Sequence, residues 1–545
     1  MSFARRLITL GGIAGFLFSS VCCCLAAYPL LPQPVEQQSR PGSFQLGKSA
    51  PILIAGDPAG LREVGEVGEY LAESLRRIRS QDYGVHWLAD SSPVRNSVLL
   101  ALEPGDAALG EEGYALQVSP EGIVIRAAKP NGVFYGVQTL LQMLDASSAG
   151  AEPGRVNAQM TAWEIPCVAI RDFPRFKWRG LMLDCSRTFQ SLDYLRKTID
   201  RMAAYKMNVL HLHLTDDQGW RLEIKKYPEL TKKGARFPRK YNEPEANQGF
   251  YTQREMRDLV EYARKRFVTI VPEIELPGHS LAALSSYPEL SCTGGPFEIF
   301  PFFKGPGVMR EVFCAGNEET FRFFENVFAE VADIFPSTFV HVGGDEVPKD
   351  RWKTCPRCQQ RMREEGLKDE QELQSYFIRR AEKILKRHGR RLIGWDEILE
   401  GGLAPEATVM SWRGMDGGIA AARAGHDVVM SPTSHCYFDY DYKAINSKRA
   451  YEFEPVPAEL SPEEGRHILG LQANFWSHID RTPERVDHQL FPRLLALAER
   501  AWSPADRRDW EGFRGRLKEH HPKLTRWGVH YNPQDLGTGT EGATR

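Results

Sequence analysis

The chain shows no excess of charge of either sign. Its 545 residues include 69 lysines and arginines and 71 aspartates and glutamates, which gives a formal net charge of −2 at pH 7. Proteins that bind nucleic acid or an acidic membrane surface through charge carry a surplus of basic residues. This sequence has no such surplus, so we expect neither nucleic acid nor a membrane surface among its partners.

The sequence also has little low-complexity or repetitive character. The only such tract is a polar tail, residues 533–545, and no internal repeat is evident. Hydrophobic residues make up 42% of the chain and aromatic residues 10%, which is typical of an ordered globular protein. A chain of this length can bury a large core, and we expect two domains.

Long hydrophobic runs are confined to the N-terminus. Arg5 and Arg6 precede an apolar stretch that contains glycines and ends in small residues near Ala27. This pattern is typical of an export signal that is removed, and not of a segment that spans the membrane. We therefore expect residues 1–27 to direct the protein to the periplasm or to the outside of the cell. The arginine pair also loosely resembles a twin-arginine signal.

Three of the ten cysteines, residues 22–24, fall in this signal. A lipid anchor on one of them stays an open alternative, although no small residue precedes Cys22 as a lipobox requires. Export permits disulfides, and Cys292 with Cys314 could close the loop between them. Cys355 and Cys358 form a lone CxxC. A structural zinc needs two more ligands, and no second pair has a matching spacing. We therefore expect a local disulfide or free thiols at this motif, and no metal.

After residue 165, short apolar runs alternate with segments of helical pattern. The runs are Trp178 to Arg187, Val209 to Asp217, Phe267 to Glu275, Phe339 to Glu346, Arg391 to Glu397, Thr408 to Arg413, Val428 to Thr433 and Gly470 to Trp476. Eight strands that alternate with helices predict a (β/α)8 TIM barrel with insertions over residues 166–532. In such a barrel the polar and aromatic residues that end the runs meet on one face.

A smaller domain is predicted before the barrel, over residues 28–165. The segments Pro51 to Ile54, Ser97 to Ala101 and Gly122 to Arg126 have the pattern of strands, and Leu61 to Arg79 that of an amphipathic helix. Nothing in this region has the spacing of a catalytic site. The predicted fold class is thus α/β, a TIM barrel preceded by a small α+β domain of structural role.

The run that begins at Phe339 ends in the sequence HVGGDE, which delivers Asp345 and Glu346 to the rim of the barrel. A solvated acidic turn is the simpler interpretation of one such pair, but similar strand ends recur along the chain. Adjacent carboxylates on an extended segment point to opposite sides. They therefore cannot face each other across one sugar bond as acid and nucleophile, and we expect them to have unequal roles.

Further polar and aromatic residues stand at the ends of the other predicted strands: Arg187, Asp216, Glu275, His279, Trp395, Trp412, Tyr437, Asp439 and Trp476. Indole rings stack on the apolar face of a pyranose, while carboxylates and arginine bind its hydroxyls. Carboxylates among three tryptophans therefore predict a carbohydrate site. Each tryptophan alone would more simply be a core residue.

Eight ordered motifs carry a resemblance to a known family. They are WRGLMLDCSRTF, NVLHLHLTDDQGWR, PEIELPGH, HVGGDE, GWDEI, SWRG, SPTSHCYFDY and QANFW. Together they resemble glycoside hydrolase family 20, the β-N-acetylhexosaminidases, in an exported bacterial type. The segment from Gly113 to Leu144 is similar to the small domain that precedes the barrel in that family.

The resemblance implies an exo-acting enzyme that removes terminal N-acetylglucosamine or N-acetylgalactosamine from an oligosaccharide or glycoconjugate, with retention. Its nucleophile would be the carbonyl oxygen of the substrate's own 2-acetamido group. Glu346 would be the general acid and later the base, which requires a carboxyl kept protonated by burial or by a like charge such as Asp345. Asp345 would bind the acetamido N–H, and Tyr437 would donate to its oxygen.

The remaining implied roles concern substrate binding. Arg187 would bind ring hydroxyls through its guanidinium fork, Asp216 would orient it or form an ion pair with it, and Asp439 would take the 4- or 6-hydroxyl. His279 would tune Glu346, and Trp395, Trp412 and Trp476 would wall the pocket. No metal or organic cofactor is expected, because the implied mechanism requires none. The cluster of His211, His213, Asp216 and Asp217 could suggest a metal site, but strand alternation accounts for it more simply.

The sequence departs from the family pattern at one position. Family members place a glutamate two residues after the last pocket tryptophan, whereas here Ser477 and His478 follow Trp476. We hypothesise that His478 relaxes the demand on the sugar's 4-hydroxyl or admits a charged or extended group there. The simpler interpretation is a local loop change, with Asp439 or Arg187 covering the hydroxyl.

Two other functions stay open. A different TIM-barrel glycosidase would need a protein carboxylate that faces Glu346 as nucleophile, for which Glu275 or Asp216 are the candidates. A non-catalytic sugar-binding barrel is the second, although the intact Asp345-Glu346 pair and Tyr437 argue against it. Ready hydrolysis of substrates without the acetamido group would support the glycosidase with a protein nucleophile over the substrate-assisted enzyme.

Overall fold

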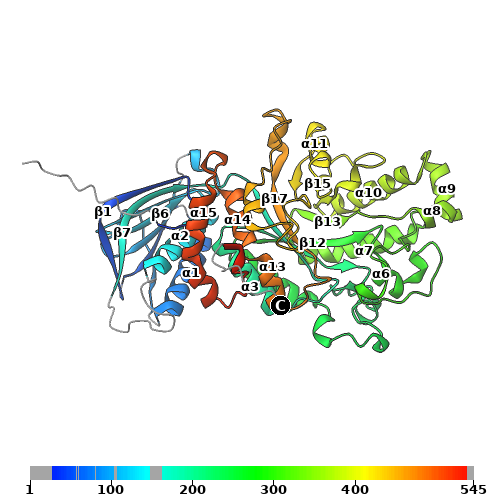
Figure 1. Ribbon diagram of the computed structural model, residues 1–545, viewed down its shortest axis with the longest axis horizontal. Helices are drawn as coiled ribbons and strands as arrows, with labels where there is room; N and C mark the ends of the chain where they lie inside the picture. Colours follow the sequence, from blue (N-terminus) through cyan, green and yellow to red (C-terminus); the bar gives the residue numbers. More distant parts are fainter. Residues whose placement is uncertain are drawn as a thin grey trace, which may run out of the picture.

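The computed structural model describes residues 28–48, 50–56, 58, 60–79, 82–103, 107–147 and 162–536. The predicted export signal lies outside the described residues, as do residues 537–545 of the predicted tail. The described chain forms a smaller N-terminal domain and a larger barrel that lie side by side along the long axis of the molecule (Figure 1). Among the described residues, no helix has the length and apolar character needed to cross a membrane.

The N-terminal domain is a seven-stranded sheet with the order β1-β7-β5-β6-β4-β2-β3. Its strands are β1 (Glu36–Gly47), β2 (Ile52–Gly56), β3 (Val85–Trp87), β4 (Val98–Leu102), β5 (Tyr114–Ser119), β6 (Gly122–Ala127) and β7 (Ala162–Asp172). Helices α1 (Leu61–Arg79) and α2 (Pro130–Ser147) pack against each other and against this sheet (Figure 1).

The three predicted strands and the predicted helix of this domain are confirmed. Strand β4 is buried along its whole length, which explains its uninterrupted apolar sequence. The sequence pattern does not predict β1, β3, β5 or β7 as strands. Strand β1 escapes because it is a polar and mostly exposed edge strand. Strand β7 pairs with β1 as far as Arg171 and with β5 as far as Asp172, so the domain extends past the predicted boundary at residue 165.

The larger domain is a closed barrel of eight parallel strands, as predicted. The strands are β8 (Trp178–Asp184), β9 (Val209–His213), β12 (Thr269–Leu276), β13 (Phe339–Gly343), β14 (Arg391–Trp395), β15 (Thr408–Ser411), β16 (Val428–Met430) and β17 (Ile468–Phe475). Each one falls within or beside a predicted run. A short hairpin, β10 (Thr215–Asp216) and β11 (Gly219–Trp220), follows β9.

Helices follow most strands and cover the outside of the barrel (Figure 1). They are α3 (Leu192–Ala204), α4 (Glu229–Lys232), α5 (Gln253–Arg264), α6 (Leu281–Ser286), α7 (Glu318–Ile334), α8 (Asp350–Thr354), α9 (Pro356–Glu365), α10 (Glu370–Arg387), α11 (Asp416–Arg423), α12 (Ser447–Glu452), α13 (Pro483–Leu490), α14 (Arg493–Trp502) and α15 (Trp510–Arg526). Side-chain caps fix several starts. Thr252 and Glu255 form a capping box at α5, and Asp369 accepts two backbone N–H groups at α10.

The two domains meet at a buried carboxylate, Asp172, which stands at the end of β7. Lys206 of the barrel places its Nζ 2.7 Å from Asp172 Oδ2, and Trp502 donates its indole N–H to Oδ1 at 2.9 Å. Tyr114 of the smaller domain donates its hydroxyl to the same carboxylate at 2.8 Å. Burial lowers the pKa of Lys206, and Asp172 opposes that effect. One polar cluster therefore fastens the barrel to the sheet.

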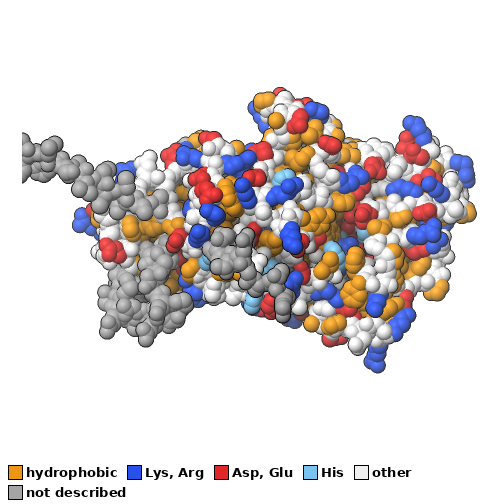
Figure 2. Space-filling model, in the orientation of Figure 1, with side chains coloured by type: hydrophobic (Ala, Val, Ile, Leu, Met, Phe, Trp, Pro, Cys, Tyr) orange, Lys and Arg blue, Asp and Glu red, His pale blue; other side chains and the backbone are white. Residues whose placement is uncertain are grey.

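The chain after the barrel also packs against its neighbours. Helix α15 lies beside the N-terminal domain (Figure 1), and a ring nitrogen of His520 lies 2.7 Å from the carbonyl oxygen of Pro29. Within the predicted tail, Asp535 accepts the backbone N–H of Ser447 at 2.9 Å. Basic and acidic side chains are interspersed over the face seen in Figure 2, and neither sign gathers into one patch there.

Candidate active site

All the predicted site residues lie at or after the carboxyl ends of the barrel strands, on the face where barrel enzymes bind substrates. Arg187 follows β8 and Asp216 is in β10. His279 follows β12, Asp345 and Glu346 follow β13, and Trp395 ends β14. Trp412 follows β15, Tyr437 and Asp439 follow β16, and Trp476 and His478 follow β17. The ion pairs and ring contacts below join most of them into one site.

The segment that carries the two carboxylates depends on glycine. Gly343 has a φ of 65° and Gly344 a φ of 90°, which side chains rarely adopt. A Cβ added at Gly343 would lie 1.7 Å from a carboxylate oxygen of Glu275. The chain can therefore turn sharply over Glu275 at the end of β13 and present Asp345 and Glu346 at the rim.

His279 lies between the two carboxylates and the rest of the polar network. Its Nε2 is 3.5 Å from Asp345 Oδ2 and 3.6 Å from Glu346 Oε2. Its Nδ1 is 3.3 Å from Asp216 Oδ1 and also 3.3 Å from Asp217 Oδ2. Burial alone would lower the pKa of His279, but Asp216 and Asp345 outweigh it and raise the pKa well above its usual value. The structure thus places a positively charged imidazole beside the predicted general acid.

Asp345 and Glu346 have different surroundings. The Asp345 side chain is 10% exposed, and among the described residues its Oδ1 has no hydrogen-bond partner. The Glu346 side chain is 44% exposed, so the protein alone does not bury it. A buried acceptor without a partner is suited to a substrate N–H. An exposed carboxyl at the rim is suited to exchange protons with water and with a leaving group.

Arg187 is held by several acceptors at once. Its Nη2 lies 2.7 Å from Asp216 Oδ2, and its Nε donates to Gln218 at 3.1 Å. Its Nη1 is 3.6 Å from Asp184 Oδ2, and the guanidinium lies 4.8 Å from the ring centre of Trp476. The predicted ion pair with Asp216 is therefore present, and it fixes a nearly buried guanidinium against one of the pocket tryptophans.

A buried glutamate inside the barrel, Glu273, organises the floor of the site. His211 Nε2 lies 3.0 Å and His341 Nδ1 2.8 Å from its carboxylate oxygens. Trp395 donates its indole N–H to Glu273 at 2.9 Å, and His213 also bonds to the carboxylate. The carboxylate of Glu273 thus has several polar partners inside the barrel, whereas Nε2 of His341 has no hydrogen-bond partner among the described residues. The hydrogen bonds explain the histidines of β9 more fully than strand alternation alone.

Two of these histidines have opposite charge preferences. Burial alone would lower the pKa of His213, but Glu273 and Asp216 raise it to about 10. Burial dominates at His211 and lowers its pKa to about 4, despite the opposing effect of Glu273. His213 Nε2 lies 2.8 Å from Asp216 Oδ2. The charged His213 therefore links the interior network to the carboxylate that holds Arg187.

The three predicted pocket tryptophans have unequal exposure. Trp412 and Trp476 are partly exposed, and the ring of Trp412 stacks on that of Tyr437 with centroids 6.1 Å apart. Trp395 is 1% exposed and bonded to Glu273, so it lies beneath the pocket. The expectation that it forms a wall is corrected in this respect. Its indole N–H needs a buried acceptor, and that bond fixes the ring in the floor.

Tyr437 and Asp439 lie on the loop after β16. Burial, reinforced by Asp439 and Asp345, raises the pKa of Tyr437 well above its usual value, so the hydroxyl stays a donor. Burial raises the pKa of Asp439 to about 7. Its Oδ1 is buried and has no hydrogen-bond partner among the described residues. Such an oxygen is suited to pair with a sugar hydroxyl.

Two buried glutamates, Glu275 and Glu397, also lie at the site. Both carboxylate oxygens of Glu275 are buried without a partner in the described chain. Burial and the nearby Asp345 raise its pKa well above the usual range. Glu397 accepts the indole N–H of Trp412 at 2.8 Å, and burial followed by Asp345 raises its pKa to about 8. From the sequence, Glu275 is expected at the strand ends and as an alternative nucleophile, whereas Glu397 is not assigned to the site. The position of Glu397 just after β14 is the signal that could have found it.

His478 lies at the edge of the site. Its ring centre is 4.7 Å from that of Phe302, which belongs to the long loop between α6 and α7. Burial and the charge of Arg187 lower the pKa of His478. The imidazole is therefore neutral near pH 7. This favours a hydrogen-bonding role over the alternative in which a positive His478 attracts an anion.

Comparison with known families decides what this arrangement belongs to. Residues 176–505 match the model of the glycosyl hydrolase family 20 catalytic domain, and residues 27–173 match that of glycosyl hydrolase family 20, domain 2. The chain belongs to glycosyl hydrolase family 20. Its barrel and its smaller domain correspond to the two parts of that family, and the predicted resemblance is confirmed.

Relatives within family 20 include a β-hexosaminidase of Porphyromonas gingivalis, 44% identical over 515 residues. The alignment covers 92% of this chain and 64% of that protein. A β-hexosaminidase of Vibrio furnissii is 38% identical over 87% of this chain and 76% of its own length.

Solved structures of family 20 have the same fold. An exo-β-N-acetylglucosaminidase of Vibrio harveyi in complex with N-acetylglucosamine has a TM-score of 0.80 and 33% identity, over 93% of this chain and 78% of that one. A β-N-acetylhexosaminidase of Streptomyces coelicolor has a TM-score of 0.78 and 31% identity, over 93% and 97%. The likeness spans both domains, so this chain is a family 20 glycoside hydrolase.

Proposed function

We propose that the protein is an exo-acting β-N-acetylhexosaminidase that removes terminal N-acetylglucosamine or N-acetylgalactosamine from glycans by substrate-assisted hydrolysis with retention. One observation supports this mechanism above the others. Asp345 is buried with a free acceptor oxygen, and the adjacent Glu346 is exposed at the rim. A mechanism with an acetamido nucleophile needs two such carboxylates, because one must hold the amide and the other must transfer protons.

In the first step, Glu346 gives its proton to the glycosidic oxygen as the bond to the anomeric carbon breaks. The acetamido carbonyl oxygen attacks the same carbon and forms an oxazolinium ring. Asp345 accepts the acetamido N–H, and Tyr437 donates its hydroxyl to the oxygen that attacks. Water then opens the ring while Glu346 takes its proton, and two inversions leave the anomeric configuration retained.

Substrate binding would use the remaining groups. The fixed guanidinium of Arg187 matches two neighbouring hydroxyls, and the unpartnered Oδ1 of Asp439 accepts another. Trp412 and Trp476 offer indole faces to the ring, and Trp395 closes the floor. These roles are those of the family's motif residues, and the fold places the matching positions of this chain at the carboxyl ends of the barrel strands.

The alternative with a protein carboxylate nucleophile has less support. Asp216 is engaged by Arg187, His213 and His279 at distances from 2.7 to 3.3 Å. Glu275 is buried, and burial with the nearby Asp345 raises its pKa well above its usual value, which disfavours the ionised form that a nucleophile needs. A non-catalytic barrel has less support, because the Asp345-Glu346 pair and Tyr437 are intact and follow β13 and β16 on the same face.

For specificity, we propose that the neutral His478 relaxes the demand for one configuration at the sugar's 4-position. A neutral imidazole can donate or accept one hydrogen bond, whereas the glutamate of the family pattern only accepts. A galacto and a gluco substrate would then be bound more equally. We also propose, from the N-terminal pattern, that the protein acts after export, in the periplasm or outside the cell.

The test is hydrolysis of aryl β-N-acetylglucosaminide and aryl β-N-acetylgalactosaminide by the purified protein, beside the matching aryl β-glucoside. Turnover of the two acetamido substrates with none of the glucoside is the expected result. Comparable turnover of the glucoside would overturn the substrate-assisted mechanism. Binding of N-acetylglucosamine without any turnover would favour the non-catalytic barrel.

A further inference from the structure

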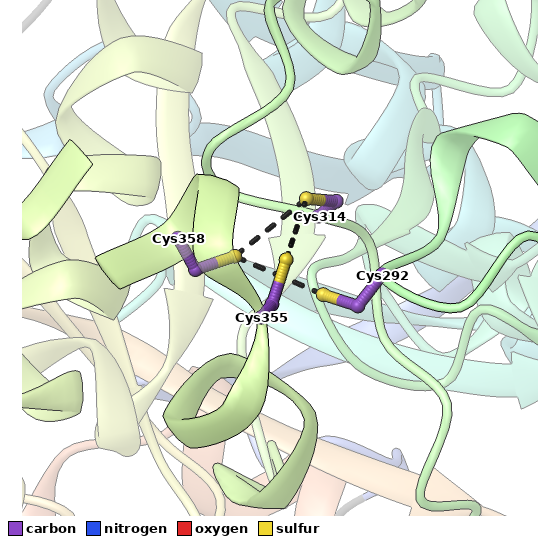
Figure 3. A group of neighbouring side chains, drawn as sticks. All are labelled: Cys292, Cys314, Cys355 and Cys358. Carbon is purple, nitrogen blue, oxygen red and sulfur yellow. Dashed lines mark hydrogen bonds between the residues drawn. The ribbon is translucent and has the colours of Figure 1, made fainter. Parts of the chain in front are cut away.

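Four cysteines that stand far apart in the sequence lie together beside the barrel. Cys292 and Cys314 are neighbours of Ser291 and Phe313, which form an antiparallel bridge at the two ends of one loop. Cys355 precedes α9, and Cys358 lies in its first turn. Figure 3 shows the four sulfurs turned toward a common centre. The second cysteine pair that the sequence spacing does not reveal is thus Cys292 with Cys314.

The distances fit a metal site. Cys292 Sγ lies 3.7 Å from Cys358 Sγ, and Cys314 Sγ lies 3.8 Å from Cys355 Sγ and 3.6 Å from Cys358 Sγ. All four sulfurs are within 4.8 Å of one another. Four sulfurs at about 2.3 Å from a tetrahedral zinc lie about 3.8 Å apart.

Disulfides fit the arrangement less well. A disulfide brings two sulfurs to about 2.05 Å and gives each sulfur a single partner. Here all four cysteines are free, and Cys314 Sγ lies within 3.8 Å of the sulfurs of both Cys355 and Cys358. Neither the predicted pairing of Cys292 with Cys314 nor a disulfide within the CxxC is present in the described chain.

The surroundings of the cluster support bound thiolates. Cys314, Cys355 and Cys358 are buried. The guanidinium of Arg357 interacts with Cys355 and Cys314, and its positive charge would offset part of the two negative charges that zinc and four thiolates carry together. A Cβ added at Gly316 would lie 2.2 Å from the carbonyl of Arg357, so only glycine lets the two segments approach this closely.

We propose that Cys292, Cys314, Cys355 and Cys358 bind one Zn²⁺ ion as a structural site. Four protein sulfurs complete a tetrahedral shell, which leaves no open position for a substrate or a water. Soft thiolate ligands in this geometry select zinc or iron, and zinc needs no redox partner. The inference does not depend on the proposed enzymatic activity, because the metal can be measured directly.

The position of the cluster indicates what the metal would hold. Cys292 and Cys314 close the loop that carries Phe302 against His478. Cys355 follows the segment that leads from Glu346 through α8. An ion pair between Glu311, in the first loop, and Arg351, in this segment, also joins the two. The zinc would therefore fasten the loop after β12 to the loop after β13, and both loops border the active site.

The first experiment measures metal in the purified full chain, prepared without added metal, by inductively coupled plasma mass spectrometry. One zinc per chain is expected. Thiols are counted under denaturing conditions with and without prior reduction, and the two counts should agree. Replacement by Co²⁺ should give the visible bands of tetrahedral cobalt with four thiolate ligands.

Variants locate the ligands. Cys358→Ser and Cys292→Ser should lose the zinc, whereas Cys167→Ser, which changes a buried free cysteine of the other domain, should keep it. If the cluster variants fail to fold, the zinc content and cobalt spectrum of the unaltered protein still decide the question. Chelation of the zinc should also expose residues 293–313 to proteolysis.

Four results would overturn the proposal. More thiols after reduction, without bound metal, would mean two disulfides. Free thiols without metal would mean an empty cluster, and iron in place of zinc would refute the assignment of the metal. Loss of zinc from Cys167→Ser to the same extent as from Cys358→Ser would refute the proposed ligands.

Discussion

Asp345 and Glu346 are neighbours in the chain, but the Asp345 side chain is 10% exposed and that of Glu346 is 44% exposed. The turn through Gly343 and Gly344 sends one carboxylate inward and the other to the rim. Two adjacent groups of the same chemistry therefore differ in what they can reach. Their substitution should give different kinetic signatures.

Glu346→Gln should reduce turnover of substrates with poor leaving groups far more than of those with good ones, because only the former need a proton when the bond breaks. General acid catalysis typically contributes about 10²- to 10⁴-fold. Rates with a series of aryl N-acetylglucosaminides of increasing leaving-group pKa measure the effect. Asp345→Asn is the matched control and should slow all members of the series alike. Equal losses from Glu346→Gln across the series would assign the acid role to another group.

Fluorination of the acetamido methyl should slow the reaction progressively, because electron withdrawal weakens the carbonyl oxygen as a nucleophile. A cyclic thiazoline mimic of the intermediate should bind much more tightly than N-acetylglucosamine, as ligands that resemble the transition state do. Steady-state rates and inhibition constants provide the test. Isolation of a glycosyl ester on a side chain during turnover would contradict substrate assistance.

His478→Glu should raise the preference for N-acetylglucosaminides over N-acetylgalactosaminides. The carboxylate would accept a hydrogen bond from an equatorial 4-hydroxyl, which the neutral imidazole does not demand. The ratio of the two kcat/KM values measures the change. Ile479→Glu is a suitable control, since Ile479 is the next residue after His478 and is 73% exposed. An unchanged ratio in His478→Glu would leave substrate choice to other loops.

Glu275→Gln should make stability less dependent on pH. Because the folded-state pKa of Glu275 lies well above its usual value of about 4.5, its protonated form is stabilising below about pH 4.5. That contribution is lost as the pH rises through the raised pKa. The glutamine variant has no proton to lose, so it should gain stability relative to the unaltered protein between pH 5 and pH 8. Chemical denaturation across this range measures the difference, and parallel curves would mean that Glu275 is ionised in the folded protein.

The barrel and most of the site follow from local patterns in the sequence. Each of the eight strands is an apolar run, and burial on both sides explains why such runs are almost uninterrupted. Because the strands of a parallel barrel all end on the same face, the predicted barrel is enough to group the residues that follow them. The sequence also predicts unequal roles for Asp345 and Glu346, but from the wrong geometry. Strand β13 ends at Gly343 and Glu346 has a φ of 45°, so a turn and not the alternation of an extended segment separates the two carboxylates.

Other features depend on contacts between distant segments, which local patterns do not contain. Strand β1 is recognisable only through its pairing with β7, since its own sequence is polar. The burial of Trp395 depends on Glu273, a residue of another strand. The four cysteines come together only when two loops meet, so the spacing of the CxxC alone argues against a metal.

The cluster at Asp172 has a consequence for any attempt to express the catalytic barrel alone. Cutting the chain between the domains would remove the carboxylate that pairs with Lys206 and accepts the indole N–H of Trp502. Removal of one partner from a buried ion pair typically costs about 3–5 kcal/mol, because the other charge stays buried without compensation. The smaller domain, although it carries none of the predicted site residues, therefore acts as a permanent counterion for the barrel.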